Sequence, residues 1–279
     1  MKIKFNKLIK RDLIFGFENN KYKFIGVTLF FIAVIWMNII NIQNEAFELG
    51  INSNDINFID VFFSLFKGID YNIFPLPINW IFIHIYITYL IGSYCYDDLS
   101  EDSAHMVVKM KNRKYIWISK TIWMISTVII FYLIILSIIL LFSMTTFDIS
   151  FEYSNFSNQS ILSNIQGDYS SIQFMLLTIV IYILSSITMS ILQMLISFIF
   201  KPTYIYIVNI FILAISLYLQ NFIIPIQGSL ILRQNIFDSM NDMNPVNTIL
   251  YNLIAFILIF IIGSVYIKRF DMLVSQKTD

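Results

Sequence analysis

Lysine and arginine are distributed very unevenly around six long apolar segments of this 279-residue chain. If successive segments cross a membrane in alternating directions, sixteen of the eighteen Lys and Arg residues fall on one side. Cationic loops remain on the cytoplasmic side of a membrane, whereas Asp and Glu contribute little to orientation. The sequence therefore predicts an all-α, polytopic membrane protein with six transmembrane helices and both termini in the cytoplasm.

The composition indicates that lipid is the solvent for much of the chain. Apolar residues make up 58% of the sequence, and the mean hydropathy is +0.74. A soluble protein of this size cannot bury so much apolar surface. The formal net charge of zero gives no indication of nucleic acid binding, and we expect none. One cysteine, Cys95, and two histidines exclude an intramolecular disulfide and argue against a structural zinc site.

Six segments approach or exceed the roughly 20 apolar residues that a helix needs to cross the hydrocarbon core. They are residues 24–42, 77–96, 116–142, 172–200, 203–224 and 246–267. Pro202 separates the fourth from the fifth, because proline cannot continue a helix without losing a hydrogen bond. The first apolar run follows seven Lys and Arg residues and lacks a small-residue cleavage site, so we expect a retained span. We therefore divide the chain into residues 1–23 and a transmembrane domain, residues 24–279.

The segment before the first span has the pattern of an amphipathic helix. Lys4, Lys7 and Arg11 share one helical stripe, and apolar side chains spread over the opposite half. Such a helix can lie in the membrane interface with its basic side toward anionic headgroups. The alternative is a basic tail that only follows the positive-inside rule.

Two outer loops also carry apolar residues. Residues 58–66 form an apolar run inside the acidic loop 43–76, and we expect a helix lying in the outer interface. Residues 225–245 follow Pro225 and combine Arg233 with apolar neighbours, which favours a short re-entrant segment.

The loop between the second and third spans is the strongest functional candidate in the sequence. Ser100 is a suitable N-cap, and Glu101 and Asp102 suit the positive N-terminus of a helix. The loop then becomes basic through Arg113, Lys114 and Lys120. This pattern predicts a short cytoplasmic helix through which a partner could move both adjoining spans. The alternative is an ordinary charged connector.

No motif for catalysis or nucleotide binding is present. The sequence has no G-x-x-x-x-G-K-[ST] run to cradle phosphates and no H-E-x-x-H metal motif. We therefore expect no enzyme activity and no cofactor in this chain.

Polar residues inside the spans offer a different kind of site. His84, Gln193, Asn209 and Asn252 could line a translocation path. More often such amides hold helices together, and a lone histidine is a neutral imidazole bonded to a neighbouring helix.

At the loop between spans two and three the chain resembles the permease subunits of type-2 ATP-binding-cassette exporters. The resemblance rests on six spans, a basic amphipathic segment before the first span, and an acidic-to-basic loop. Its most specific part runs from Met110 to Lys120, where Arg113-Lys-Tyr-Ile-Trp117-Ile-Ser-Lys120 resembles the family's basic pair, aromatic residue and Ser-Lys at the start of the third span.

The resemblance implies a mechanism and partners. Two permease subunits, identical or related, would pair in the cell membrane, each docked on a separate ATPase subunit that holds ATP and magnesium. Residues around Lys4, Lys7 and Arg11 would form the connecting helix along the inner leaflet. The ATPase-coupling helix would comprise Asp98, Leu99, Ser100, Glu101, Asp102, Ser103, Ala104 and His105. The apolar spans favour export of an amphipathic, antimicrobial-type peptide or a lipid-like molecule.

Two other function classes remain open at this point. A membrane immunity protein would bind a membrane-active peptide without transporting it, so protection would not need ATP hydrolysis. An ion-coupled secondary carrier would depend on an ion gradient. The scarcity of ionisable residues in the spans argues against the carrier.

Overall fold

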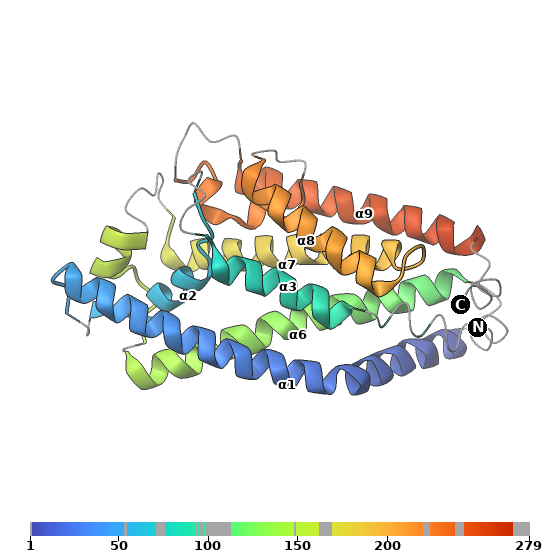
Figure 1. Cartoon of the computed structure of the whole chain (residues 1–279), viewed down its shortest axis with the longest axis horizontal. Helices are drawn as coiled ribbons and strands as arrows, with labels where there is room; N and C mark the ends of the chain where they lie inside the picture. The colour runs from blue at the N-terminus through green and yellow to red at the C-terminus, as the bar shows by residue number, and fades with distance from the viewer. Residues whose placement is uncertain are drawn as a thin grey trace.

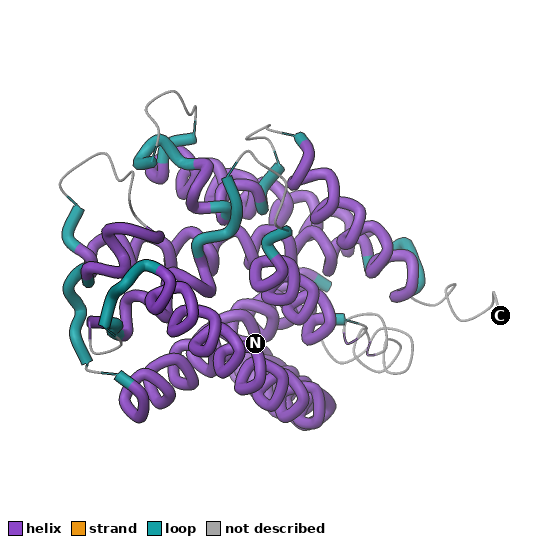
Figure 2. The backbone as a smooth tube through the Cα atoms, turned by 60° about the vertical axis from the view of Figure 1, so that its left-hand side comes forward, coloured by secondary structure: helices purple, strands orange, loops and turns teal. Residues whose placement is uncertain are grey.

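The computed structural model describes residues 2–52, 55–70, 76–92, 94, 98, 113–147, 149–161, 169–219, 224–237 and 243–269. These residues form a bundle of helices, and no strand occurs among them (Figures 1 and 2). Four of the helices are long and apolar enough to cross a membrane. They are α1 (Lys2–Glu48), α6 (Lys114–Thr146), α7 (Ser171–Ile196) and α9 (Pro245–Arg269). The fold therefore fits a multi-pass membrane protein.

Two shorter apolar helices coincide with the second and fifth predicted spans. The helix α3 (Ile78–Ile91) has 14 residues and α8 (Pro202–Tyr218) has 17. At 1.5 Å per residue they are about 21 and 26 Å long, somewhat less than the hydrocarbon core of ~30 Å. Pro202 at the first position of α8 makes the predicted break after the fourth span.

The amphipathic segment and the first span are one continuous helix. The 47 residues of α1 extend about 70 Å, more than twice the thickness of the hydrocarbon core, and run along the whole bundle in Figure 1. The boundary that we placed after residue 23 is therefore not a structural break. The cause is a stripe of buried residues at spacings of three to seven that follows one face: Leu8, Asp12, Gly16, Asn20, Val27, Phe31, Ile35, Ile39, Ile42 and Ala46.

Most of the face of α1 that carries this stripe packs against α6, its main partner in the bundle. Gly16 permits a close approach, because a Cβ there would overlap the indole of the buried Trp123. The N-terminal part of α1 is therefore packed closely against α6.

The helix α2 (Phe58–Phe66) confirms the predicted helical run but not its position in the outer interface. Eight of its nine residues are buried, and it contacts α1, α3, α6 and α7. Asn57 and Asp60 close a reciprocal capping box at its start. The apolar run is therefore enclosed by protein, where its aromatic side chains fill the space between the longer helices.

Asp60 fastens α2 to the residues that precede the π-helical turn η2 (Ser157–Ile161) and to that turn itself. Its Oδ1 accepts hydrogen bonds from the hydroxyls of Ser154, at 2.8 Å, and Ser157, and its Oδ2 accepts one from the Asn57 N–H at 2.8 Å. Burial raises the pKa of this carboxyl, and the hydrogen bonds from Ser157, Asn57 and Ser154 oppose that rise.

The segment between α8 and α9 folds back into the bundle as two short 3₁₀ turns, η3 (Gln227–Ser229) and η4 (Ile231–Arg233). Arg233 is 1% exposed and donates to the carbonyls of Ser216 and Leu217, both at 2.9 Å. These are among the last carbonyls of α8, where the helix dipole favours a cation. Lys67 and Arg233 are the two residues outside the group of sixteen Lys and Arg residues predicted on one side. Arg233 therefore has a structural role.

Candidate functional site

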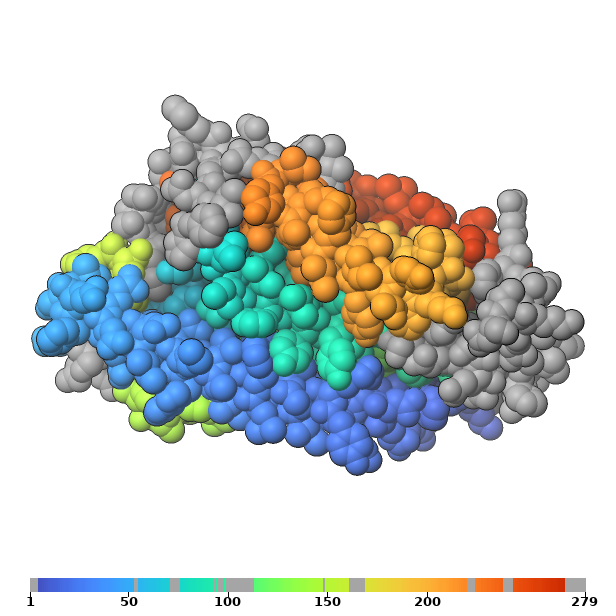
Figure 3. Space-filling view, in the orientation of Figure 1, coloured from blue at the N-terminus to red at the C-terminus, as the bar shows by residue number. Residues whose placement is uncertain are grey.

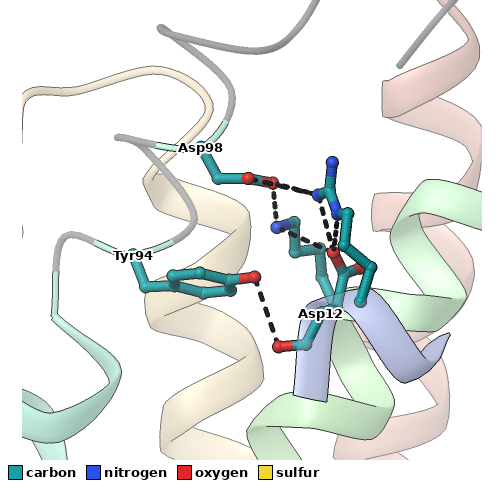
Figure 4. A network of polar contacts seen from close by, with 5 residues as sticks. Asp12, Tyr94 and Asp98 are labelled. Carbon is teal, nitrogen blue, oxygen red and sulfur yellow. Dashed lines mark hydrogen bonds and ion pairs between the residues drawn. The ribbon is translucent and has the colours of Figure 1, made fainter. Parts of the chain in front are cut away.

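A network of ionised side chains lies buried at the end of the bundle where α1 and α6 begin. Arg11 and Asp12 lie on α1, Lys120 lies on the first turns of α6, and Tyr94 and Asp98 follow the end of α3. Figure 4 shows the side chains of Asp12 and Asp98 turned toward the same point, with Tyr94 beside them. Three segments far apart in sequence therefore meet at one cluster, which we name the charge network.

The charge network contains two carboxylates and two cations. Arg11 Nη2 lies 2.7 Å from Asp12 Oδ1 and 3.0 Å from Asp98 Oδ2. Lys120 Nζ pairs with Asp98 and lies 3.6 Å from Asp12 Oδ1. Each cation therefore contacts both carboxylates, and the four formal charges cancel.

Tyr94 closes the charge network on one side. Its hydroxyl donates to the Asp12 backbone carbonyl at 3.4 Å, and its ring lies 4.1 Å from Lys120 Nζ in a cation–π contact. Tyr94 also packs on Trp123 with a ring separation of 4.2 Å. Apolar packing thus continues directly from the ion pairs into the core.

Burial makes each member of the charge network dependent on the others. Asp12 and Lys120 are fully buried and Asp98 is 4% exposed, whereas the Arg11 side chain remains 34% exposed. Removing one partner from a buried pair leaves an uncompensated charge, which typically costs about 3–5 kcal/mol. The ion pairs therefore fix the position of the segment after α3 relative to α1 and α6.

The sequence analysis predicts three groups of functional residues on the cytoplasmic side, and the structure brings together one member of each group. Arg11 comes from the predicted connecting helix, Asp98 from the predicted coupling helix and Lys120 from the basic start of the third span. Asp98 and Lys120 are enclosed, so neither presents its charge to a partner or to lipid headgroups. The other coupling residues, Leu99 to His105, lie outside the described residues.

The remaining basic candidates lie at the same end of the bundle. Lys7 is exposed on α1, and the side chain of Lys4 lies outside the described part. Arg113, immediately before α6, donates to the Lys268 carbonyl in the last turn of α9 at 3.5 Å, and Lys114 is the next residue. The start of α6 is thereby tied to the end of α9.

The candidates for a translocation path separate into two groups. Gln193 donates to the Thr88 carbonyl at 2.9 Å and so joins α7 to α3. Asn252 donates to Ser185 Oγ at 3.3 Å and joins α9 to α7. These two amides hold helices together. Asn209 on α8 is different, because within the described residues neither atom of its buried amide has a hydrogen-bond partner.

His84 is enclosed between Trp80 and the stacked ring of Tyr182. Its Nε2 lies 3.2 Å from Ser229 Oγ, which also accepts a hydrogen bond from Trp80 Nε1 at 2.7 Å. His84, Gln193 and Asn209 border one small cavity of about 10 Å³, which has room for roughly one water molecule.

Sequence reasoning missed Asp12 and Tyr94. Asp12 interrupted the amphipathic pattern of the N-terminal segment, and that interruption was the available signal. An acidic residue on a predicted basic helix needs a partner if its face is buried, and here that face packs on α6. Comparison of the chain with protein-family models, with curated proteins and with solved structures finds no match.

Proposed function

We propose that this chain is the permease subunit of an ATP-driven exporter, with ATP hydrolysis in a separate partner subunit. In this proposal six helices cross the cell membrane, including the short α3 and α8. Both termini lie in the cytoplasm, and a second permease subunit completes the translocation path. The chain itself carries no catalytic group.

The observation that carries this proposal is the charge network. A permease driven by a separate ATPase needs rigid connections between the docking element and several membrane helices, because only contacts that move together transmit a displacement. The ion pairs of Asp98 with Arg11 and Lys120 link the segment after α3 to α1 and α6. A force on residues 99–105 would therefore reach three helices at once.

The substrate class rests on the chemistry of the bundle. The exposed faces of α6, α7 and α9 are largely apolar, and so is the middle of α1, whereas the exposed charges of α1 lie toward its two ends. Such surfaces favour an amphipathic peptide or a lipid-like molecule over a sugar. Export of, or protection against, a membrane-active peptide is the function that we propose.

The test is affinity purification of the tagged chain from its native membrane in mild detergent, with mass spectrometry of the proteins that come with it. We expect a soluble ATPase in stoichiometric amount. The double variant Glu101→Lys with Asp102→Lys should reduce ATPase recovery while the chain still inserts in the membrane.

The matched control reverses two charges at the opposite end of the molecule, in Glu48→Lys with Asp55→Lys, where both residues are exposed. ATPase recovery should not change in that variant. A preparation without ATPase, repeated after crosslinking in the membrane, would contradict the proposal. Protection against a peptide that persists without ATP would then favour the immunity protein.

A further inference from the structure

A lateral groove opens between α1, α3 and α8, three helices that lie side by side on the face shown in Figure 3. Its volume is about 650 Å³, within the ~300–1,000 Å³ of typical ligand sites. Phe30, Phe82, Ile85, Tyr86 and Leu213 supply an apolar and aromatic lining. A groove of this size could hold part of an amphiphile.

One end of the groove is cationic and the other is apolar. Lys23 contributes its charge at the end nearer the charge network, where its Nζ lies 5.1 Å from the ring centre of Tyr89. Phe30 on α1 and Phe82 on α3 are each seven residues from that level, which is about 10 Å along the helices. Along the groove, a positive charge is therefore followed by an apolar surface, which matches the headgroup and then the acyl chain of an anionic lipid.

Asn209 also borders the groove, but its amide is enclosed. It lies three residues beyond the lining residue Tyr206 on α8, about 4.5 Å deeper in the bundle. The side chain is 2% exposed, and among the described residues its amide nitrogen and oxygen have no hydrogen-bond partner. A ligand in the groove therefore does not reach this amide, and Lys23 is the charged residue that lines the groove.

We propose that the groove binds one anionic phospholipid from the leaflet nearest the charge network. The phosphate lies at Lys23, and an acyl chain lies along Phe30 and Phe82. Basic pockets between membrane helices recognise anionic headgroups in this way. The site needs only that the chain lies in a membrane and does not rest on the exporter proposal.

Gly26 provides a specific way to fill the groove. It faces the groove from α1, and no atom lies within 4 Å of a Cβ placed there. Gly26→Leu should therefore occupy the groove without displacing a neighbour, and leucine also has the higher helix propensity. Lys23→Gln removes only the charge, and Lys21→Gln removes a charge two residues away on the exposed surface.

The experiment is native mass spectrometry of the delipidated full chain after addition of dioleoyl phosphatidylglycerol or dioleoyl phosphatidylcholine. We expect the wild type to retain the anionic lipid about fivefold better than the zwitterionic one, the contribution of one lysine. Lys23→Gln should remove this preference, Gly26→Leu should lose both lipids, and Lys21→Gln should behave as the wild type.

A second measurement follows the melting temperature of the delipidated chain. Added phosphatidylglycerol should raise this temperature more in the wild type than in Lys23→Gln. Equal retention of the two lipids by the wild type, unchanged binding in Gly26→Leu, or equal losses in Lys21→Gln and Lys23→Gln would each overturn the proposal. So would a stable dimer that retains no lipid, because a second copy would then cover the groove.

Discussion

At the residue scale, Lys120 is the member of the charge network whose loss has the largest expected effect. Lys120→Met leaves Asp12 and Asp98 buried with one cation of the charge network, Arg11, so one negative charge is uncompensated. We expect the free energy of unfolding to fall by about 3–5 kcal/mol. Chemical denaturation in mixed micelles measures this change.

Two further variants separate charge balance from simple loss of a side chain. Adding Asp98→Asn to Lys120→Met leaves the Arg11–Asp12 pair balanced, so the double variant should be more stable than Lys120→Met alone. Lys21→Met, on the exposed surface of α1, should change stability by less than about 0.5 kcal/mol. A double variant as unstable as the sum of its single variants would show that the ion pairs are not coupled.

Asp60 gives stability a pH dependence of defined sign. Burial raises its pKa above the ordinary value of 3.8, so the folded chain binds this proton more tightly than the unfolded chain. Its contribution to stability is then fully present below about pH 3.8 and is lost as the pH rises through the folded pKa. Relative to the intrinsic exchange rate at each pH, residues 58–66 should therefore be more protected at pH 4 than at pH 7.

The isosteric variant Asp60→Asn is the control for this pH dependence. It keeps an oxygen acceptor for Ser154 and Ser157 but cannot ionise. After correction for the intrinsic pH dependence of exchange, residues 58–66 of the variant should be protected equally at both pH values. Greater protection of the wild type at pH 7 would contradict the predicted sign.

At the element scale, Arg233 determines how α8 ends. Arg233→Met would remove hydrogen bonds to the carbonyls of Ser216 and Leu217 and leave both buried. Hydrogen bonds to charged groups contribute about 1.5–3 kcal/mol each, so we expect the last turn of α8 to exchange at least tenfold faster. Lys67→Met is the matched control. The backbone carbonyl of Lys67 accepts a hydrogen bond from the Leu232 N–H, and the substitution keeps that carbonyl.

The helices were largely predictable from the sequence, and their junctions were not. Apolar runs identify α6, α7 and α9 because a span needs a fixed length of apolar chain. The continuity of α1 was not predictable, because the buried stripe from Leu8 to Ala46 includes the polar residues Asp12 and Asn20. A search for apolar residues at helical spacing does not find a stripe that these two residues interrupt. Their partners, Lys120 and the Leu90 carbonyl, are 70 or more residues away.

The same limit applies to the candidate site. The sequence indicated Arg11, Asp98 and Lys120 as members of three separate groups, since charge patterning along the chain is local information. Their convergence depends on the packing of α1 against α6, which brings residues about 90–110 positions apart into contact. Enclosure of α2 is likewise a tertiary result, because an apolar run alone does not distinguish a buried helix from one in the interface.

At the scale of the whole molecule, the direction of each helix makes a topology prediction. The helices α1 and α6 begin, and α9 ends, at the end of the bundle that holds the charge network (Figure 1). The starts of α7 and α9 lie at the opposite end. If α3 and α8 both cross the membrane, all positions at the charge-network end face the cytoplasm and all positions at the other end face outward.

Single cysteines introduced into a Cys95→Ser background test this arrangement in intact cells. A membrane-impermeant maleimide should label Asn52→Cys and Asn247→Cys, which are exposed at the opposite end, and should label Lys10→Cys only after permeabilisation. The position at Asn247 is decisive for α8, because α9 would begin in the cytoplasm if α8 did not cross. Labelling of Asn52→Cys but not Asn247→Cys would reduce the number of crossings, and labelling of Lys10→Cys in intact cells would reverse the orientation on which the exporter proposal depends.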